Sequence, residues 1–164
     1  MKPNIRIIAV GGLKEGCLLK AADFYISRLE PIYNLSVIEL PDEPAPEDLS
    51  EAGRQAALAR EGRRVSGRFI PLSIKVSLAV EGRSADLPFF RALINKASDE
   101  GKGLDFIIGG SLGLADFVLR QSDHRISLSG LTFPHRLTRL LLFEILCEAG
   151  DYFVKSAYNK SNNF

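Results

Sequence analysis

The sequence predicts an α/β fold in which helices flank a mostly parallel sheet. Short runs rich in β-branched and aliphatic residues alternate with longer segments whose apolar residues recur at helical spacing. This alternation is typical of a parallel sheet covered by helices on both faces. A chain of 164 residues with 46% hydrophobic and 25% charged residues fits one domain, and we expect residues 1–164 to form it.

The first half of the chain contains two predicted strands and two predicted helices. Residues 5–10 are apolar and end at a glycine pair, so we expect a buried first strand. Residues 15–29 repeat apolar positions at helical intervals before a proline. Residues 35–40 form the second predicted strand. A proline-rich stretch breaks the chain, and acidic residues beside Pro46 favour the start of a helix that runs to roughly Arg60.

The second half continues the same alternation. Residues 71–80 are apolar and predict a third strand, followed by a turn at Gly82. Ser84 is then the expected cap of a helix that extends to about residue 99. Residues 104–108 predict the fourth strand. The remaining elements are a short helix after Gly113, a strand over residues 125–128 and a long final helix that starts at Pro134.

The final helix is apolar on more than one face. Its apolar side chains are Leu137, Leu140, Leu141 and Ile145 in one stripe, and Leu142, Phe143 and Leu146 on another face. One small sheet buries only part of such a helix. We therefore expect its second face to pack against another subunit in a homodimer. The alternative is that the helix is central to the core of a monomer.

Composition and motifs exclude several functions. The formal charge of +1 provides no overall field for binding a polyanion. The two cysteines form neither a metal motif nor a disulfide framework. The spacing of Gly109, Gly110 and Gly113 differs from that of a dinucleotide fingerprint, and the sequence has no triphosphate loop or His-Glu-x-x-His motif. We expect no bound metal, no membrane partner and a cytoplasmic location.

Two glycine-containing turns carry the strongest functional signal. The first is Phe-Ile-Ile-Gly-Gly-Ser-Leu-Gly-Leu at residues 106–114, and the second is Ser-Leu-Ser-Gly-Leu-Thr-Phe-Pro-His at residues 127–135. Glycine permits close approach to the main chain, so both turns suggest a cofactor bound against backbone. His135 starts the final helix, where the macrodipole disfavours protonation of the ring. Its neutral ring could bind substrate or backbone, or act as a structural cap.

Together with Arg-Leu-Thr-Arg at residues 136–139, the two turns resemble those of the bacterial ribosomal large subunit pseudouridine methyltransferase family of the SPOUT superfamily. The order of elements is similar along nearly the whole chain. The resemblance implies a SPOUT-like fold whose C-terminal segment forms a trefoil knot. It also implies a homodimer that uses S-adenosyl-L-methionine to methylate ring nitrogen N3 of a pseudouridine in 23S rRNA on the assembled ribosome.

The resemblance also implies which residues bind the cofactor. They are Leu78, Gly110, Ser129, Gly130, Leu131, Thr132, Phe133 and Pro134. Apolar walls and backbone groups suit an adenine ring. Methyl transfer depends mainly on positioning, and the imide proton must leave. The candidate catalytic groups are His135 and Arg139, which lie one helical turn apart on the same face.

The C-terminal part of the chain departs from the family pattern. Glu148 stands where the family usually has an arginine, and Ala157 and Asn159 replace a proline and a histidine. Tyr158 and Lys160 match the family, so we expect Tyr158, Asn159 and Lys160 to contact RNA. The alternative functions are a non-catalytic ribosome-binding or assembly factor of the same fold, or a methyltransferase that acts on another RNA.

Overall fold

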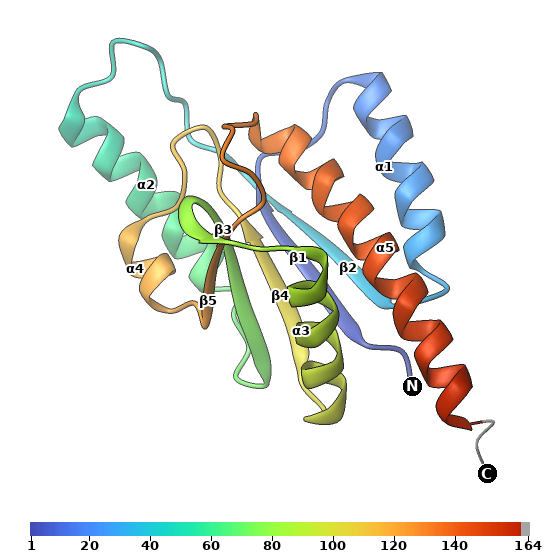
Figure 1. The fold of residues 1–164 in the computed structure, drawn as a ribbon. Coiled ribbons are helices and arrows are strands. Elements are labelled where there is room, and N and C mark those ends of the chain that lie inside the picture. Colours follow the sequence, from blue (N-terminus) through green and yellow to red (C-terminus); the bar gives the residue numbers. More distant parts are fainter. Residues whose placement is uncertain (162–164) are drawn as a thin grey trace.

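The chain forms one five-stranded sheet covered by helices (Figure 1). The computed structural model describes the backbone of residues 1–161 and the side chains among them, except those of residue 153 and residues 156–161. The strands are β1 (Asn4–Val10), β2 (Asn34–Leu40), β3 (Ser73–Ser84), β4 (Gly103–Ile108) and β5 (His124–Ser127). The helices are α1 (Gly16–Leu29), α2 (Glu51–Ser66), α3 (Leu87–Asp99), α4 (Asp116–Arg120) and α5 (His135–Ser161).

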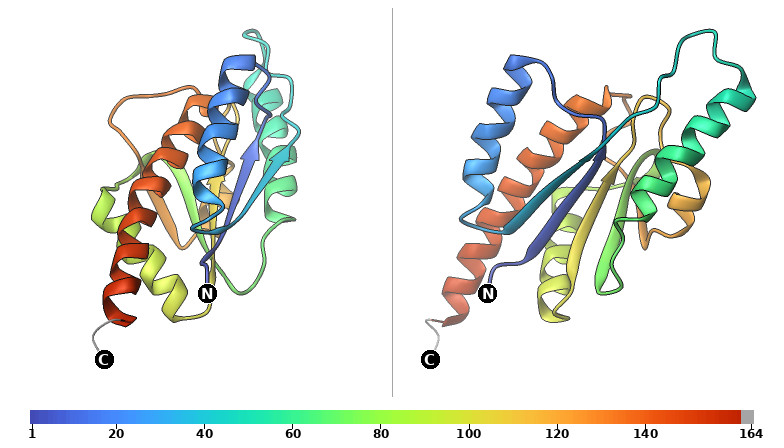
Figure 2. Two further views of the ribbon diagram at one scale, coloured as in Figure 1. Left: turned by 90° about the vertical axis from the view of Figure 1, so that its right-hand side faces the viewer. Right: turned by 180° about the vertical axis from the view of Figure 1, so that it is seen from behind.

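All neighbouring strands are parallel, in the order β2-β1-β4-β3-β5. Helices α1, α3 and α5 pack on one face of the sheet, and α2 and α4 pack on the other (Figure 2). The expected α/β fold with a parallel sheet flanked by helices is therefore confirmed. Because every strand points the same way, the carboxyl ends of all five lie along one edge, where ligands of open α/β sheets bind.

The core has two parts because strand side chains alternate between the two faces of the sheet. In β1, Ile5, Ile7 and Ala9 join the larger cluster under α1, α3 and α5. Ile8 and Val10 join the smaller cluster under α2 and α4. All five side chains are almost completely buried. Strand β1 is thus covered on both faces, which explains why its sequence is a continuous apolar run rather than an alternating one.

Helix α2 begins and ends later than the sequence predicts. The Ser50 hydroxyl caps it by accepting a hydrogen bond from the Gly53 N–H at 3.1 Å, and the helix ends at Ser66 rather than near Arg60. Val65 is completely buried and packs with Ile8 on the face of the sheet that α2 covers. Burial of this side chain stabilises the last turns, although the arginine-rich sequence around it gives little amphipathic signal.

Strand β3 is longer than expected, and Ser84 does not cap α3. The strand continues to Ser84, and Asp86 is the cap because its side chain accepts a hydrogen bond from the Phe89 N–H at 2.9 Å. The extension exists because β3 pairs a second time with β5: both Leu78 and Arg83 are partners of Ile126. Tertiary pairing therefore keeps Ser84 extended.

Helix α5 is buried on one face and partly uncovered on another. Leu142, Phe143 and Leu146 are at most 1% exposed and pack inside the protomer, where the Tyr33 hydroxyl donates to the Leu146 carbonyl at 2.9 Å. This face agrees with a helix central to the monomer core. The other stripe is incompletely covered, and its Leu137 is 38% exposed. Packing of this stripe against a second subunit in a homodimer therefore stays a prediction.

None of the helices in the described part of the chain is both long and apolar enough to cross a membrane. No cluster of three or more histidine, cysteine, aspartate or glutamate side chains that could hold a metal ion occurs among these residues.

Candidate cofactor and catalytic site

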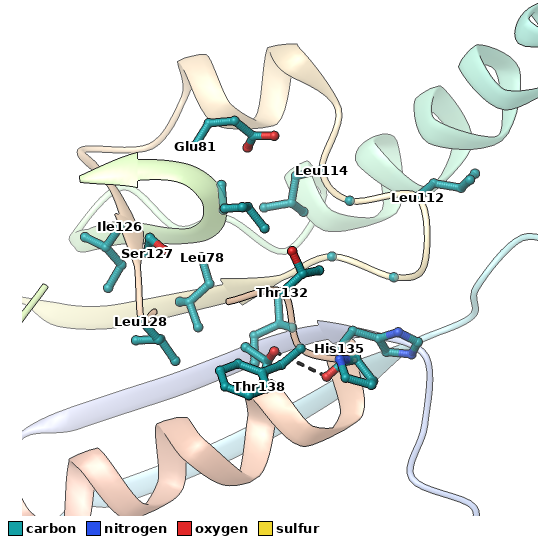
Figure 3. A pocket seen from close by; sticks show the side chains of 18 of the residues that line it. Leu78, Glu81, Leu112, Leu114, Ile126, Ser127, Leu128, Thr132, His135 and Thr138 are labelled. Atoms are coloured by element: carbon teal, nitrogen blue, oxygen red, sulfur yellow. Dashed lines mark hydrogen bonds between the residues drawn. The ribbon is translucent and has the colours of Figure 1, made fainter. Parts of the chain in front are cut away.

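A cavity of about 1080 Å³ opens where β4 and β5 end, beside residues 78–81 of β3. Three segments that are distant in sequence line it: residues 78–81, the segment around residues 108–116, and the segment around residues 126–135. In Figure 3, Leu78, Ile126 and Leu128 lie on one side of this cavity and His135 on the other. The cavity is large enough for a nucleoside-sized ligand, and its place at the carboxyl edge of the sheet is usual for α/β proteins.

The turn after β4 folds back on its own backbone. The Gly113 N–H donates to the Gly110 carbonyl at 3.1 Å, and Gly113 has a φ of +83°. A β-carbon on Gly109 would lie 2.5 Å from the Gly113 carbonyl carbon, a distance that no side chain accommodates. Gly109 and Gly113 are therefore required for the shape of the turn itself, apart from any contact with a ligand.

Strand β3 makes an excursion beside the cavity. Because Leu78 and Arg83 both pair with Ile126, residues 79–82 lie outside the regular pairing. A β-carbon on Gly82 would lie 2.5 Å from the Ile126 carbonyl carbon, so glycine allows the excursion to close tightly against β5. This geometry places Glu81 among the residues that line the cavity.

Hydrogen bonds from short polar side chains shape the turn between β5 and α5. The Ser127 hydroxyl donates to the Ser129 carbonyl at 2.7 Å, and the Leu131 N–H donates to the Ser129 hydroxyl at 3.0 Å. Thr138 donates to the Pro134 carbonyl from its N–H at 3.0 Å and from its hydroxyl at 3.3 Å. The Leu131 side chain is 70% exposed and lines the cavity, so it is an apolar surface available to a ligand.

His135 lies between the cavity and the end of β1. A β-carbon on Gly11 would lie 3.2 Å from the His135 Nε2 atom, and Nε2 has no hydrogen-bond partner among the described residues. Burial lowers the pKa of His135, the charge of Arg136 lowers it further, and Asp42 opposes them. The neutral ring expected from the sequence is thus favoured mainly by burial, not only by its place at the start of a helix.

Arg139 is close to His135 in sequence but lies outside the set of residues that line the cavity. It is 2% exposed and donates to the Gly11 carbonyl at 2.6 Å and to the carboxylate of Glu39. These contacts tie the first turns of α5 to the ends of β1 and β2. Arg139 therefore lies outside the cavity lining, where its hydrogen bonds hold the start of α5 against the ends of β1 and β2.

Seven of the eight expected cofactor residues line the cavity; they are Leu78, Gly110, Ser129, Leu131, Thr132, Phe133 and Pro134. Gly130 belongs to the same turn but is not among the lining residues. Tyr158, Asn159 and Lys160 fall in the last turns of α5, and their side chains lie outside the described part of the chain. Whether these residues bind a ligand stays a prediction.

Sequence reasoning missed Glu81 and Asp116, which also line the cavity. Neither lysine nor arginine is found among the lining residues, and the histidine in the lining has a lowered pKa. The charged side chains of the lining are therefore acidic. Such a cavity disfavours ligands that carry phosphates and suits a flat, apolar ligand with a positive charge. The turn predicted at Gly82 was the available signal for Glu81, because turns after strands supply site residues.

Nearly the whole chain matches proteins of one kind. A family model described as a predicted SPOUT methyltransferase matches residues 3–150. A ribosomal RNA large subunit methyltransferase H from Listeria monocytogenes is 39% identical over 142 residues, which cover 86% of this chain and 89% of the relative. A protein of the same name from Carboxydothermus hydrogenoformans is 38% identical over 158 residues, covering 96% and 99% of the two chains.

A solved structure has a similar fold. The probable methyltransferase from Bordetella pertussis Tohama I matches with a TM-score of 0.60, covering 90% of this chain and 94% of that chain. The two sequences are 15% identical, so this likeness concerns the fold alone.

Proposed function

Because the chain belongs to the SPOUT methyltransferase family, we propose that it uses S-adenosyl-L-methionine to methylate ring nitrogen N3 of a pseudouridine in 23S rRNA. The relatives matched over most of their length are named ribosomal RNA large subunit methyltransferases, which supports rRNA as the substrate class. The resemblance of the two glycine turns supports the cofactor, the assembled ribosome as the target and a cytoplasmic location.

The observation that carries this proposal is the composition of the cavity. S-adenosyl-L-methionine combines a flat adenine with a sulfonium cation and has no phosphate. The cavity offers the apolar surfaces of Leu78 and Leu131, the backbone of two turns, and acidic rather than basic side chains. Glycine loops that hold the phosphates of nucleotide cofactors often include a lysine that pairs with the phosphate charge, and the lining contains no lysine. The lining fits the methyl donor better than it fits those cofactors.

The proposed chemistry needs alignment and removal of one proton. The bound cofactor supplies the methyl group. The walls of the cavity hold the donor so that the attacking nitrogen can approach in line, and we assign the removal of the imide proton to His135. His135 lines the cavity, and its lowered pKa favours the unprotonated ring, which can accept that proton. We assign Arg139 a positioning role, because it contacts Gly11 and Glu39 rather than the cavity.

The homodimer is proposed on the α1–α5 face of the protomer. Helices α1 and α5 pack together there, and they carry the exposed apolar side chains of Leu19, Phe24 and Leu137. Their exposed fractions are 43%, 58% and 38%, respectively. Exposed apolar side chains on two adjacent helices are consistent with a face that is covered in an assembled dimer.

We also propose that the C-terminal segment is threaded as a trefoil knot. Strand β5 is at the edge of the sheet beside β3, whereas α5 packs against α1 near the opposite edge. The segment between β5 and α5 therefore crosses over the strand ends, and it does so at the cavity, beside the turn after β4. This course supports threading of the kind that the family resemblance implies. The C-terminal residues Tyr158, Asn159 and Lys160 are proposed to contact the RNA.

Two measurements test the proposed function. Calorimetry should show that the purified protein binds S-adenosyl-L-methionine. Mass mapping of rRNA should show one methylated pseudouridine in the parent strain, its loss in a deletion strain and its recovery with the wild-type gene. Binding of the cofactor with unchanged 23S rRNA in the deletion strain would favour another RNA substrate. Failure to bind the cofactor would favour a non-catalytic ribosome-binding or assembly factor.

A further inference from the structure

Glu81 is held at the cavity by the backbone on both sides of it. The excursion of β3 begins after Leu78 and ends at Arg83, and both residues pair with Ile126. Gly82 lies so close to Ile126 that a β-carbon there would be 2.5 Å from its carbonyl carbon. Glu81 directly precedes this contact, so the backbone that carries it has little freedom. Figure 3 shows its side chain at the cavity on the side away from α5.

The structure gives the Glu81 carboxylate no internal partner. It makes no side-chain hydrogen bond or ion pair with any described residue. Asp116, the other acidic residue of the lining, stands in the first turn of α4, where an acidic side chain complements the free N–H groups. The position of Asp116 thus has a local explanation, whereas that of Glu81 does not. A cationic ligand bound in the cavity would supply this exposed carboxylate with a partner.

We propose that Glu81 is a specificity-determining residue. It makes the cavity favour the positively charged methyl donor over the product, whose sulfur carries no charge. This inference rests on the proposed function. During transfer the attacking nitrogen forms a bond to the methyl carbon, and the electron pair of the broken C–S bond stays on sulfur. The sulfonium thereby becomes a neutral thioether, while the adenosine and amino-acid parts are unchanged. The donor and the product differ at the cavity by one methyl group and one positive charge.

A carboxylate in the lining attracts the donor by an electrostatic energy that the product lacks. Lysine and arginine are missing from the lining residues, so no cation there neutralises Glu81. The residue is exposed, and solvent reduces the attraction to the range of surface ion pairs. The upper end of that range corresponds to a preference of about fivefold, and the preference should weaken at high salt. The preference would help the product to leave when fresh donor is present.

The test is calorimetry with the full-length protein, using S-adenosyl-L-methionine and S-adenosyl-L-homocysteine as separate ligands. We expect Glu81→Gln to weaken binding of the donor by about two- to fivefold and binding of the product by a smaller factor. Raising the salt concentration should narrow the difference between the wild-type protein and the variant. Glu30→Gln is the matched control, because Glu30 is exposed just after α1, near the start of β2 and away from the cavity. This control should leave both affinities unchanged.

The outcomes separate the inference from the proposed function. A wild-type protein that binds neither ligand would overturn the proposed function itself. If the wild-type protein binds the donor and Glu81→Gln weakens both ligands equally, Glu81 recognises a part that they share, and charge selection is refuted. An unchanged ratio of the two affinities in the variant leads to the same conclusion. Thermal melting should confirm that the variant keeps its fold, as expected for substitution of an exposed side chain.

Discussion

Substitution of Gly109 by alanine should lower the stability of the protein and damage the proposed cofactor site. The new β-carbon would lie 2.5 Å from the Gly113 carbonyl carbon and 3.1 Å from its α-carbon. Ordinary contacts begin near 3.4 Å, so the two limbs of the turn must separate by nearly 1 Å. Because both atoms belong to backbone, no side-chain rotation relieves the contact. Overpacking of this kind costs about 1–3 kcal/mol of the free energy of unfolding. In a chain of this size, that corresponds to a decrease in Tm of roughly 2–12 °C.

Gly130→Ala is the matched control for this prediction. Gly130 belongs to the other glycine turn, but a β-carbon there would have no atom within 4 Å, and its φ is not positive. We expect an unchanged or slightly higher Tm, because alanine restricts the unfolded chain by about 0.4–1 kcal/mol. Melting curves should show a lower Tm for Gly109→Ala and no decrease in Tm for Gly130→Ala, and calorimetry with S-adenosyl-L-methionine should show loss of affinity for Gly109→Ala. Equal effects of the two substitutions would refute the steric reasoning.

Three further predictions concern titration and assembly. Burial lowers the pKa of His135. The contribution of His135 to the free energy of unfolding is therefore present above the ordinary histidine pKa and is lost as the pH falls. Between about pH 7.5 and pH 5.5, denaturant titrations should show a larger loss of stability for the wild-type protein than for His135→Gln. Burial raises the pKa of Glu61, so its contribution to the free energy of unfolding is present at low pH and is lost as the pH rises. Glu61→Gln should therefore gain stability relative to the wild-type protein between about pH 4 and pH 7. Parallel curves of stability against pH for the two proteins would contradict this. Phe24→Glu should convert a dimer into a folded monomer in light scattering, whereas a wild-type protein that is monomeric at micromolar concentration would remove the dimer proposal.

The sequence pattern predicts which elements exist better than it predicts where they end. All five strands and all five helices were expected, because their apolar spacing is set by burial against the sheet. The errors are at Ser84 and at both ends of α2. Ser84 has the chemistry of a cap, but the second pairing of β3 with Ile126 keeps it extended. Local preference was outweighed by a contact between segments more than 40 residues apart in sequence.

The site was predictable where backbone chemistry marks it. Glycine turns after β4 and β5 indicated the cavity because a turn at the carboxyl edge of a parallel sheet is a usual place for a ligand. Glu81 could not be selected from sequence, since an acidic residue beside Gly82 is equally typical of a solvated turn. Its role depends on the double pairing with Ile126, which only the assembled sheet reveals.

The separation of His135 from Arg139 changes how variants of this helix should be interpreted. Helical spacing predicted that both side chains share one face, and both lie next to Gly11 in different ways. A β-carbon on Gly11 would lie 3.2 Å from the His135 Nε2 atom, whereas the Gly11 carbonyl accepts a hydrogen bond from Arg139. Arg139 therefore fixes the start of α5, and with it the turn that lines the cavity. Loss of activity in an Arg139 variant reports first on the placement of that turn. Only slower turnover with unchanged cofactor affinity would assign Arg139 to the chemical step.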